Sequence, residues 1–202
     1  MPDYSQIFTL LFVMLGPVKM LGPFAKITQH ADPVFIRNIA IRAIFYSIIT
    51  LTVAAFLGEK IIIRVAVPVP ILALSGGIIL FLVALLGVIQ QFEPGKPYEG
   101  PVGNPPPEVA LYPLTFPTIV TPYGIAAVIV FNTLNPDLRN KLILGAIVVG
   151  IMVLNLLVML FARPFFKPLA ITLAILGAIL GVLTVSLGAK IIYNNLSILL
   201  AK

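Results

Sequence analysis

Two apolar stretches of this sequence are each interrupted by proline and glycine, and the interruptions carry the residues best suited to binding a ligand. Gly16-Pro17-Val18-Lys19 breaks a stretch near the N-terminus, and Thr121-Pro122-Tyr123-Gly124 breaks one near the middle of the chain. Proline removes an amide donor and clashes with the preceding turn, while glycine weakens a helix. A helix that restarts after such a break exposes amides that attract a carboxylate. The candidate solute-binding residues are Gly16, Pro17, Val18, Lys19, Thr118, Thr121, Pro122, Tyr123 and Gly124.

Lys19 is an ionisable residue inside an apolar run. At 1.5 Å per residue it lies roughly 18 Å from the start of that run, close to the middle of a bilayer. A charge at this depth is costly and marks a functional candidate. It would hold a solute carboxylate, or stand where a coupling cation, sodium or a proton, otherwise binds. Pairing with the carbonyls of the broken helix is the structural alternative.

Other polar and small residues leave alternatives open. A second pair, Gly22-Pro23, predicts that the chain is unwound between the two pairs. The threonines around the second break either face a ligand or bond to their own helix. Asn155 either joins two helices or touches the solute, and the small residues Gly76-Gly77 indicate close helix packing.

Composition excludes several classes of protein. The chain has 202 residues, of which 60% are hydrophobic and only 10% charged, against about 25% charged in soluble domains. There is no cysteine and a single histidine, His30, so thiol and multi-histidine metal sites are excluded. The net charge of +6 is scattered over short loops, which argues against a nucleic-acid partner. We expect no enzyme, no metal and no cofactor, and no Asp or Glu within the membrane spans.

These features predict an all-α membrane protein whose partner is the lipid bilayer. About 20 apolar residues span a bilayer as a helix, and the apolar runs do not alternate as barrel strands do. A Pro/Gly-rich linker at 93–108 separates a first half, 1–92, from a second half, 109–202. Six spans are expected, at about 7–28, 39–57, 71–92, 109–132, 142–162 and 169–192.

The two halves share an internal repeat. Pro17 and Pro122 take equivalent places, and the third span aligned on the sixth gives identities. A repeat with three spans must insert in opposite orientations in its two copies, which predicts two inverted three-helix repeats with discontinuous helices 1 and 4. Basic residues are balanced between the two sides, and the dense first loop favours an outside N-terminus. The identities pair Leu72, Ala73, Gly76, Ile78, Leu82, Leu86 and Gly87 with Leu173, Ala174, Gly177, Ile179, Leu183, Leu187 and Gly188.

Three segments give the chain a family resemblance over nearly its whole length. FLGEKIII at 56–63, ALSGGIILFLVAL at 73–85 and EVALYPLTFPTIVTPYGIAAVIV at 108–130 are similar to the MarC family of bacterial and archaeal membrane proteins. The most specific piece is an acidic residue, Glu108, followed by Pro-Leu-x-x-Pro ending at Pro117. The resemblance implies a two-fold inverted repeat, and a neutral amino acid transporter with glycine or alanine as the solute.

The chain departs from the family pattern at both breaks. Members commonly carry Asn-Pro-x-Gly at the first break and Gly-Pro-Gly at the second, where this chain has Gly16 to Lys19 and Thr121 to Tyr123. Lysine can replace a bound cation or favour a more anionic solute. We expect a multi-pass inner-membrane transporter of a small zwitterionic solute working by alternating access. The alternative is a membrane protein of the same fold without transport activity, in a structural or assembly role. The oligomeric state is left open.

Overall fold

The computed structural model describes residues 4–90, 105–134, 136–161 and 166–201. Most of the predicted linker, 93–104, lies outside the described residues. Several side chains also lie outside the described part, namely those of Gln6, Val18, Gly87 and Gln90 and those at 166–177.

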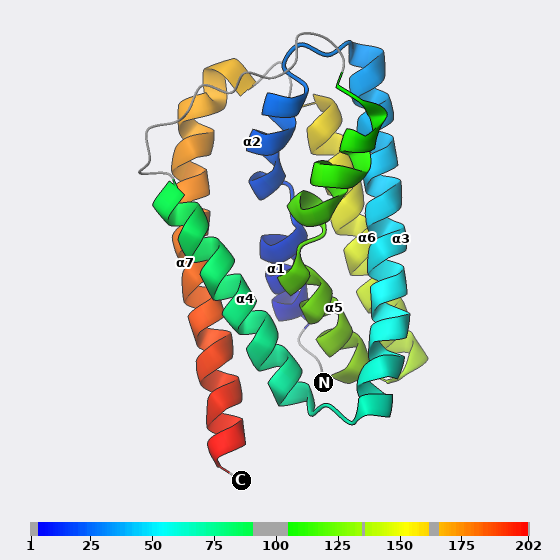
Figure 1. Ribbon diagram of the computed structural model, residues 1–202, viewed down its shortest axis with the longest axis vertical. Coiled ribbons are helices and arrows are strands. Elements are labelled where there is room, and N and C mark those ends of the chain that lie inside the picture. Colours follow the sequence, from blue (N-terminus) through cyan, green and yellow to red (C-terminus); the bar gives the residue numbers. More distant parts are fainter. Residues whose placement is uncertain (1–3, 91–104, 135, 162–165, 202) are drawn as a thin grey trace.

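The described chain is a bundle of helices of unequal length (Figure 1). The first half contains two short helices followed by two long ones, and the second half begins with two short irregular turns before three longer helices. In chain order they are α1 (Tyr4–Leu15), α2 (Val18–Ile27), α3 (Pro33–Val65), α4 (Val69–Gln90), η1 (Pro107–Ala110), η2 (Leu111–Ile119), α5 (Pro122–Leu134), α6 (Leu138–Phe161) and α7 (Phe166–Leu200).

The described helices provide five to six membrane spans. Five are long and apolar enough by themselves, counting α1 and α2 together over Ile7–Ile27. The sixth is the pair Pro107–Ile119 and Pro122–Leu134, whose axes meet at 64°. Large apolar side chains such as Phe45, Ile63 and Leu82 are exposed along the outer helices, as expected where lipid rather than water covers the surface.

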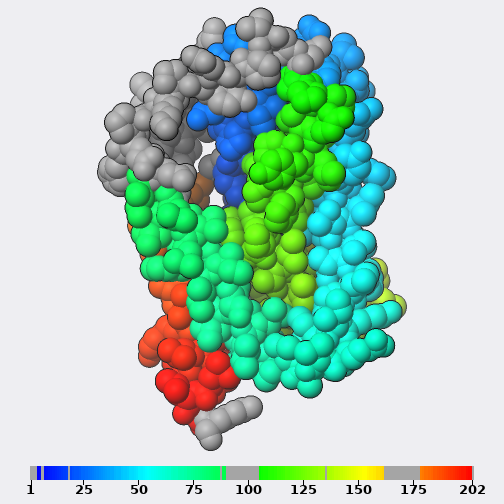
Figure 2. Space-filling view, in the orientation of Figure 1, coloured from blue at the N-terminus to red at the C-terminus, as the bar shows by residue number. Residues whose placement is uncertain are grey.

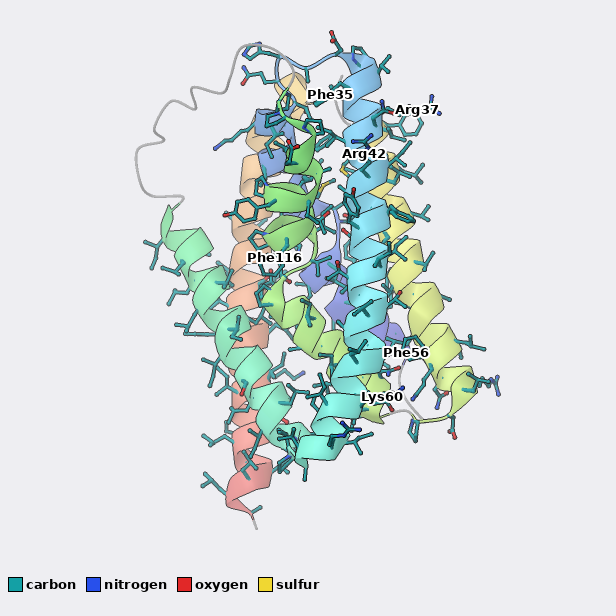
Figure 3. All side chains as sticks on the ribbon, turned by 45° about the vertical axis from the view of Figure 1, so that its right-hand side comes forward. Phe35, Arg37, Arg42, Phe56, Lys60 and Phe116 are labelled. Atoms are coloured by element: carbon teal, nitrogen blue, oxygen red, sulfur yellow. The ribbon has the colours of Figure 1, made fainter. Side chains whose placement is uncertain are left out.

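The α3 helix is longer than the span at 39–57. Pro33 occupies its first turn, where a missing amide costs nothing, and Ala66 ends it in the left-handed conformation with φ 54°. Its 33 residues extend about 50 Å at 1.5 Å per residue, well beyond a hydrocarbon core of about 30 Å. Charged residues therefore lie near both ends: Figure 3 shows Arg37 and Arg42 near the start and Lys60 near the end.

This length also carries an acidic residue. The α3 helix continues past the span expected at 39–57 and through Glu59. The Glu59 carboxylate accepts hydrogen bonds from Lys141 at 2.7 and 2.8 Å and from the Asn132 amide at 2.7 Å. The absence of Asp and Glu from the spans stays a prediction, because Glu59 lies beyond the expected span 39–57, near the end of a helix longer than the hydrocarbon core.

The spans alternate in direction through the bundle. In Figure 1, the stacked α1 and α2 rise through the centre, whereas the chain from η1 through η2 to α5 descends beside them. Each span of the first half packs on a span of the second: α3 on α6, α4 on α7, α1 on α5 and α2 on η2. The two interrupted spans thus lie antiparallel at the centre of the bundle, with the long helices around them.

The α4 and α7 helices pack closely through glycine. A Cβ atom at Gly77 would lie 2.7 Å from Ile191 Cγ2, and one at Gly188 would lie 2.8 Å from the backbone N and Cα of Phe81. A Cβ at Gly76 would lie 3.0 Å from the Cβ of Ala126 on α5. The expectation of close packing at Gly76-Gly77 is confirmed: small residues let helix backbones approach where no water drives them together.

Candidate functional site

The first break separates α1 from α2 at two residues. The Gly16 amide donates to Phe12 O at 2.8 Å and closes α1, while Pro17 caps the start of α2 with φ −71° and ψ −24°. A Cβ at Gly16 would collide with Phe12 O, so only glycine fits here. Pro17 lacks an amide hydrogen, but the first amides of a helix have no partner inside that helix. A proline at this position therefore costs no intrahelical hydrogen bond.

The unwinding predicted between Gly16-Pro17 and Gly22-Pro23 is wrong. The α2 helix runs continuously from Val18 to Ile27 and contains Pro23. Pro23 is the sixth of the ten residues of α2 and removes one intrahelical hydrogen bond there, yet the helix continues to Ile27. Gly22 and Pro23 are exposed, and Figure 2 shows blue atoms of this first span in a hollow between η2 and α4.

The second break separates η2 from α5. Two residues inside η2, Tyr112 and Phe116, have extended backbones, and Val120 is extended at φ −90° and ψ 96°. Thr121 then caps α5, because its Oγ1 accepts a hydrogen bond from the Gly124 amide at 3.1 Å. Pro122 follows as the first residue of α5, the position that proline favours.

The two breaks meet each other. The Thr121 hydroxyl donates to Met14 O at 3.5 Å, the long limit of a hydrogen bond. A Cβ at Gly124 would lie 2.5 Å from Leu15 Cδ2, so the second break also needs its glycine to approach the first. The end of η2 and the start of α5 therefore lie against the last turn of α1.

Lys19 joins the two breaks. Its Nζ donates to Met14 O, near the end of α1, and to Ile119 O at 3.3 Å, at the end of η2. The same ammonium lies 5.3 Å from the ring centroid of Tyr123 on α5, within cation–π range. The ammonium thus contacts the carbonyl ends of two helical segments and the face of a tyrosine.

The predicted site residues do not all belong to this junction. Gly16, Pro17, Thr121, Tyr123 and Gly124 are buried there, and Lys19 is half-buried. Of the other candidates, Thr118 is half-buried within η2, the Pro122 side chain is exposed at the start of α5, and the side chain of Val18 lies outside the described residues.

Thr115 is one of the threonines around the second break, and its contacts are with backbone rather than with the junction. Its hydroxyl lies 2.7 Å from Ala110 O and 3.1 Å from Ala43 O, so it ties η2 to α3. This matches the alternative in which a threonine in a membrane helix bonds to nearby backbone rather than to a ligand. Here one of the two carbonyls belongs to a neighbouring helix.

Asn155 belongs to the junction, and the sequence left its role open. It is completely buried on α6, and its Nδ2 donates to Leu15 O at 2.8 Å. Its Oδ1 is the buried side-chain acceptor for which the described residues offer no partner. A buried acceptor without a donor costs free energy, so this oxygen is available to a ligand. A lone amide inside an apolar helix was the only signal in the sequence.

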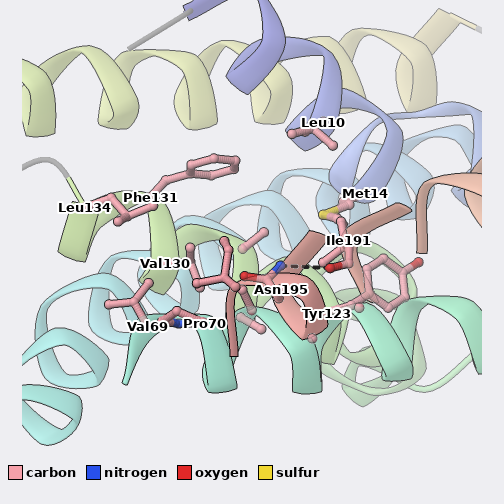
Figure 4. Close-up of a pocket in the computed structure, with 16 residues that line it drawn as sticks. Leu10, Met14, Val69, Pro70, Tyr123, Val130, Phe131, Leu134, Ile191 and Asn195 are labelled. Carbon is pink, nitrogen blue, oxygen red and sulfur yellow. Dashed lines mark hydrogen bonds between the residues drawn. The ribbon is translucent and has the colours of Figure 1, made fainter. Parts of the chain in front are cut away.

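A cavity reaches the junction from α4 and α7. It has a volume of about 340 Å³ and is bordered by Met14 of α1 and Tyr123 of α5. Figure 4 shows both residues at its edge, with Asn195 hydrogen-bonded to Ile191 O at 2.8 Å. Its lining is apolar apart from Tyr123 and Asn195. Lys19 does not line the cavity, but it contacts both Met14 and Tyr123.

No metal site stands out beside the junction. Within the described ranges, no group of three His, Cys, Asp or Glu side chains is placed to hold a metal ion. The available ligands at the junction are neutral oxygens of the backbone, of Thr121 and of Asn155, which suit a hard monovalent cation or a donor group of a solute.

Known proteins resemble this chain over most of its length. Residues 1–200 match MarC family integral membrane proteins. The inner membrane protein YhgN of Escherichia coli K12, described as a UPF0056 protein, is 27% identical over 76% of this chain and 77% of its own length. A UPF0056 membrane protein of Buchnera aphidicola subsp. Baizongia pistaciae is 25% identical over 79% of both chains. One from Aquifex aeolicus is 27% identical over 70% of this chain and 67% of its own. No solved structure matches the chain.

Proposed function

This chain belongs to the MarC family of integral membrane proteins, and from that premise we propose that it is a secondary transporter of a small zwitterionic solute. Glycine and alanine are the solutes that the family resemblance favours. The observation that carries the proposal is the meeting of two broken spans at one buried junction, where Lys19 contacts carbonyls from both. Irregular backbone at membrane depth persists where it is buried in protein or lines a cavity, and transporters place their sites there.

Two observations support an inverted repeat, which would in turn favour a transporter. Met14 lies three residues before Pro17 and Ile119 three residues before Pro122, so the helical segments that end at the two breaks are spaced alike in the two halves. Corresponding spans also pack on each other in antiparallel pairs. We infer that α1 with α2, and η2 with α5, are two discontinuous helices related by a pseudo-two-fold axis in the membrane plane.

The junction offers complementary groups for a zwitterion. The starts of α2 and α5 carry positive partial charge from the amides of their first turns, which attracts a carboxylate. The Asn155 Oδ1 atom is a buried acceptor without a donor, which suits the ammonium of an amino acid. The cavity at Met14 and Tyr123 provides a route to the junction, and rocking of one repeat against the other would give alternating access. The membrane is the inner membrane, as in the name of the Escherichia coli relative.

Uptake of labelled glycine and alanine into proteoliposomes tests the proposal. We expect uptake and counterflow by the purified protein, and about a tenfold loss for Thr121→Val, equivalent to about 1.4 kcal/mol, since Thr121 caps α5 at the junction. The matched control is Thr184→Val, whose hydroxyl bonds only Leu180 O in its own helix and which should transport within about twofold of the native rate.

A second function is favoured by one observation. Lys19 ties both breaks together and the cavity is lined almost entirely by apolar residues, as expected of a membrane protein that does not move solutes and has a structural or assembly role. Folded protein that neither takes up nor exchanges any small amino acid would support this function and contradict transport.

A further inference from the structure

The carbonyl oxygens at the ends of α1 and η2 form a site of the kind that binds a coupling cation. Met14 and Ile119 each precede the proline of their break by three residues, so their carbonyls occupy equivalent places in the two halves. Broken spans of transporters coordinate sodium or protons with such helix-end carbonyls, which carry negative partial charge. Further oxygens lie beside them: Thr121 Oγ1 is 3.5 Å from Met14 O, and Asn155 contacts the next carbonyl, that of Leu15.

In this protein the position is filled from within the chain. The Lys19 ammonium donates to the two equivalent carbonyls, Met14 O and Ile119 O. An ammonium has three donors and no acceptor, and the remaining direction faces the Tyr123 ring at 5.3 Å. We propose that Lys19 is a built-in cation that occupies a monovalent-cation site between the two breaks, so that solute binding requires no mobile coupling cation.

Two other lysines, Lys141 and Lys26, do not occupy a comparable position between the two breaks. The ion pair of Glu59 and Lys141 lies at another place, between α3 and α6, and satisfies itself with Asn132. Lys26 is in the last turn of the same helix as Lys19 but is exposed, where a lysine near a helix C-terminus has an ordinary stabilising role. Lys19 differs because its amine contacts carbonyls from both halves of the chain.

The inference predicts that removal of Lys19 opens the site to a free cation. In Lys19→Met the two carbonyls keep their positions but lose the ammonium, so sodium, lithium or potassium can enter. We expect thermal unfolding of the native protein in detergent to differ by less than about 1 °C between sodium and choline chloride. For Lys19→Met, the midpoint should rise with one of the alkali cations by roughly 3–6 °C per tenfold excess over its Kd.

Two further variants make this test decisive. Lys26→Met removes the same charge from the exposed end of α2 and should show no cation response beyond that of the native protein. Lys19→Gln keeps a donor for the carbonyls without the charge, so it provides a second folded variant that should also respond. An unchanged midpoint in every alkali salt for both Lys19 variants would overturn the inference. Failure of both to fold in any of these salts would overturn it too, because a mobile cation would then not replace the ammonium.

The cation measurement is separate from transport. It uses no solute, so a cation response in Lys19→Met without any uptake would leave this inference standing and remove the transport function on which its mechanistic consequence rests. If the protein does transport, native uptake should be unchanged when choline replaces sodium, while uptake by Lys19→Met should fall at least tenfold on the same replacement. Equal dependence on sodium in both proteins would contradict the inference and leave transport intact.

Discussion

The approach of α4 to α7 gives a sharp quantitative prediction about Gly188. In Gly188→Ala the added Cβ would lie 2.8 Å from the backbone N and Cα of Phe81, where ordinary contacts begin at 3.4 Å. The contact is to backbone, so no side chain can rotate away, and the two helices must move apart to make room. Overpacking of this kind costs about 1–3 kcal/mol.

A matched glycine isolates that cost. Gly150 on α6 is exposed and has nothing within 4 Å of an added Cβ. Both Gly150→Ala and Gly188→Ala gain the same helix propensity, about 1 kcal/mol, so their difference is the steric cost alone. At about 2–4 °C per kcal/mol for a chain of this size, Gly188→Ala should unfold roughly 2–12 °C below Gly150→Ala. Thermal unfolding in detergent measures both midpoints, and equal midpoints would refute the close packing of α4 on α7.

Three other predictions concern polar contacts. Glu59→Gln should lower stability by about 1 kcal/mol, because the carboxylate pairs with Lys141 at 2.7 Å and both side chains are mostly buried. The same change in a Lys141→Met background should cost clearly less. An equal loss of stability in both backgrounds would show that Glu59 and Lys141 are not coupled. Asn155→Leu should cost about 0.6–1.7 kcal/mol, the range for hydrogen bonds between membrane helices, since its amide holds Leu15 O; an unchanged unfolding midpoint would contradict this. Thr121→Val should cost about 1 kcal/mol through loss of the α5 cap, whereas Thr121→Ser should unfold close to the native midpoint and a matching loss would argue against capping.

The all-helical membrane character followed from composition, and over the described residues every regular element is a helix, with five to six candidate membrane spans. A chain with so few charges has no means to cover a water-facing surface, and long apolar runs can satisfy their backbones in lipid only as helices. The ends of the helices were less predictable. Helix α3 continues past the apolar run through Glu59, which pairs with Lys141, and partners so far apart in sequence leave no local pattern.

The junction of the two breaks was predictable where backbone chemistry decides it. Gly16 and Gly124 were singled out as helix breakers, and both prove to be positions where a Cβ would collide with a neighbour. Proline had to be judged by its place: Pro17 begins a helix, whereas Pro23 lies inside one without ending it. The contact of Asn155 with Leu15 was beyond prediction, because it depends on how α6 packs against α1.

The glycine-mediated packing of α4 on α7 also bears on how the protein is made. Helix α4 is complete at Gln90, but its partner begins only at Phe166. At synthesis rates of about 5–20 residues per second, roughly 4–15 s pass between the end of α4 and the first residue of α7. During this interval the part of α4 that packs on α7, around Gly77 and Phe81, lacks its partner helix. A chain truncated before α7 would keep that part unpaired, so its fate would depend on membrane proteases and chaperones rather than on its own stability.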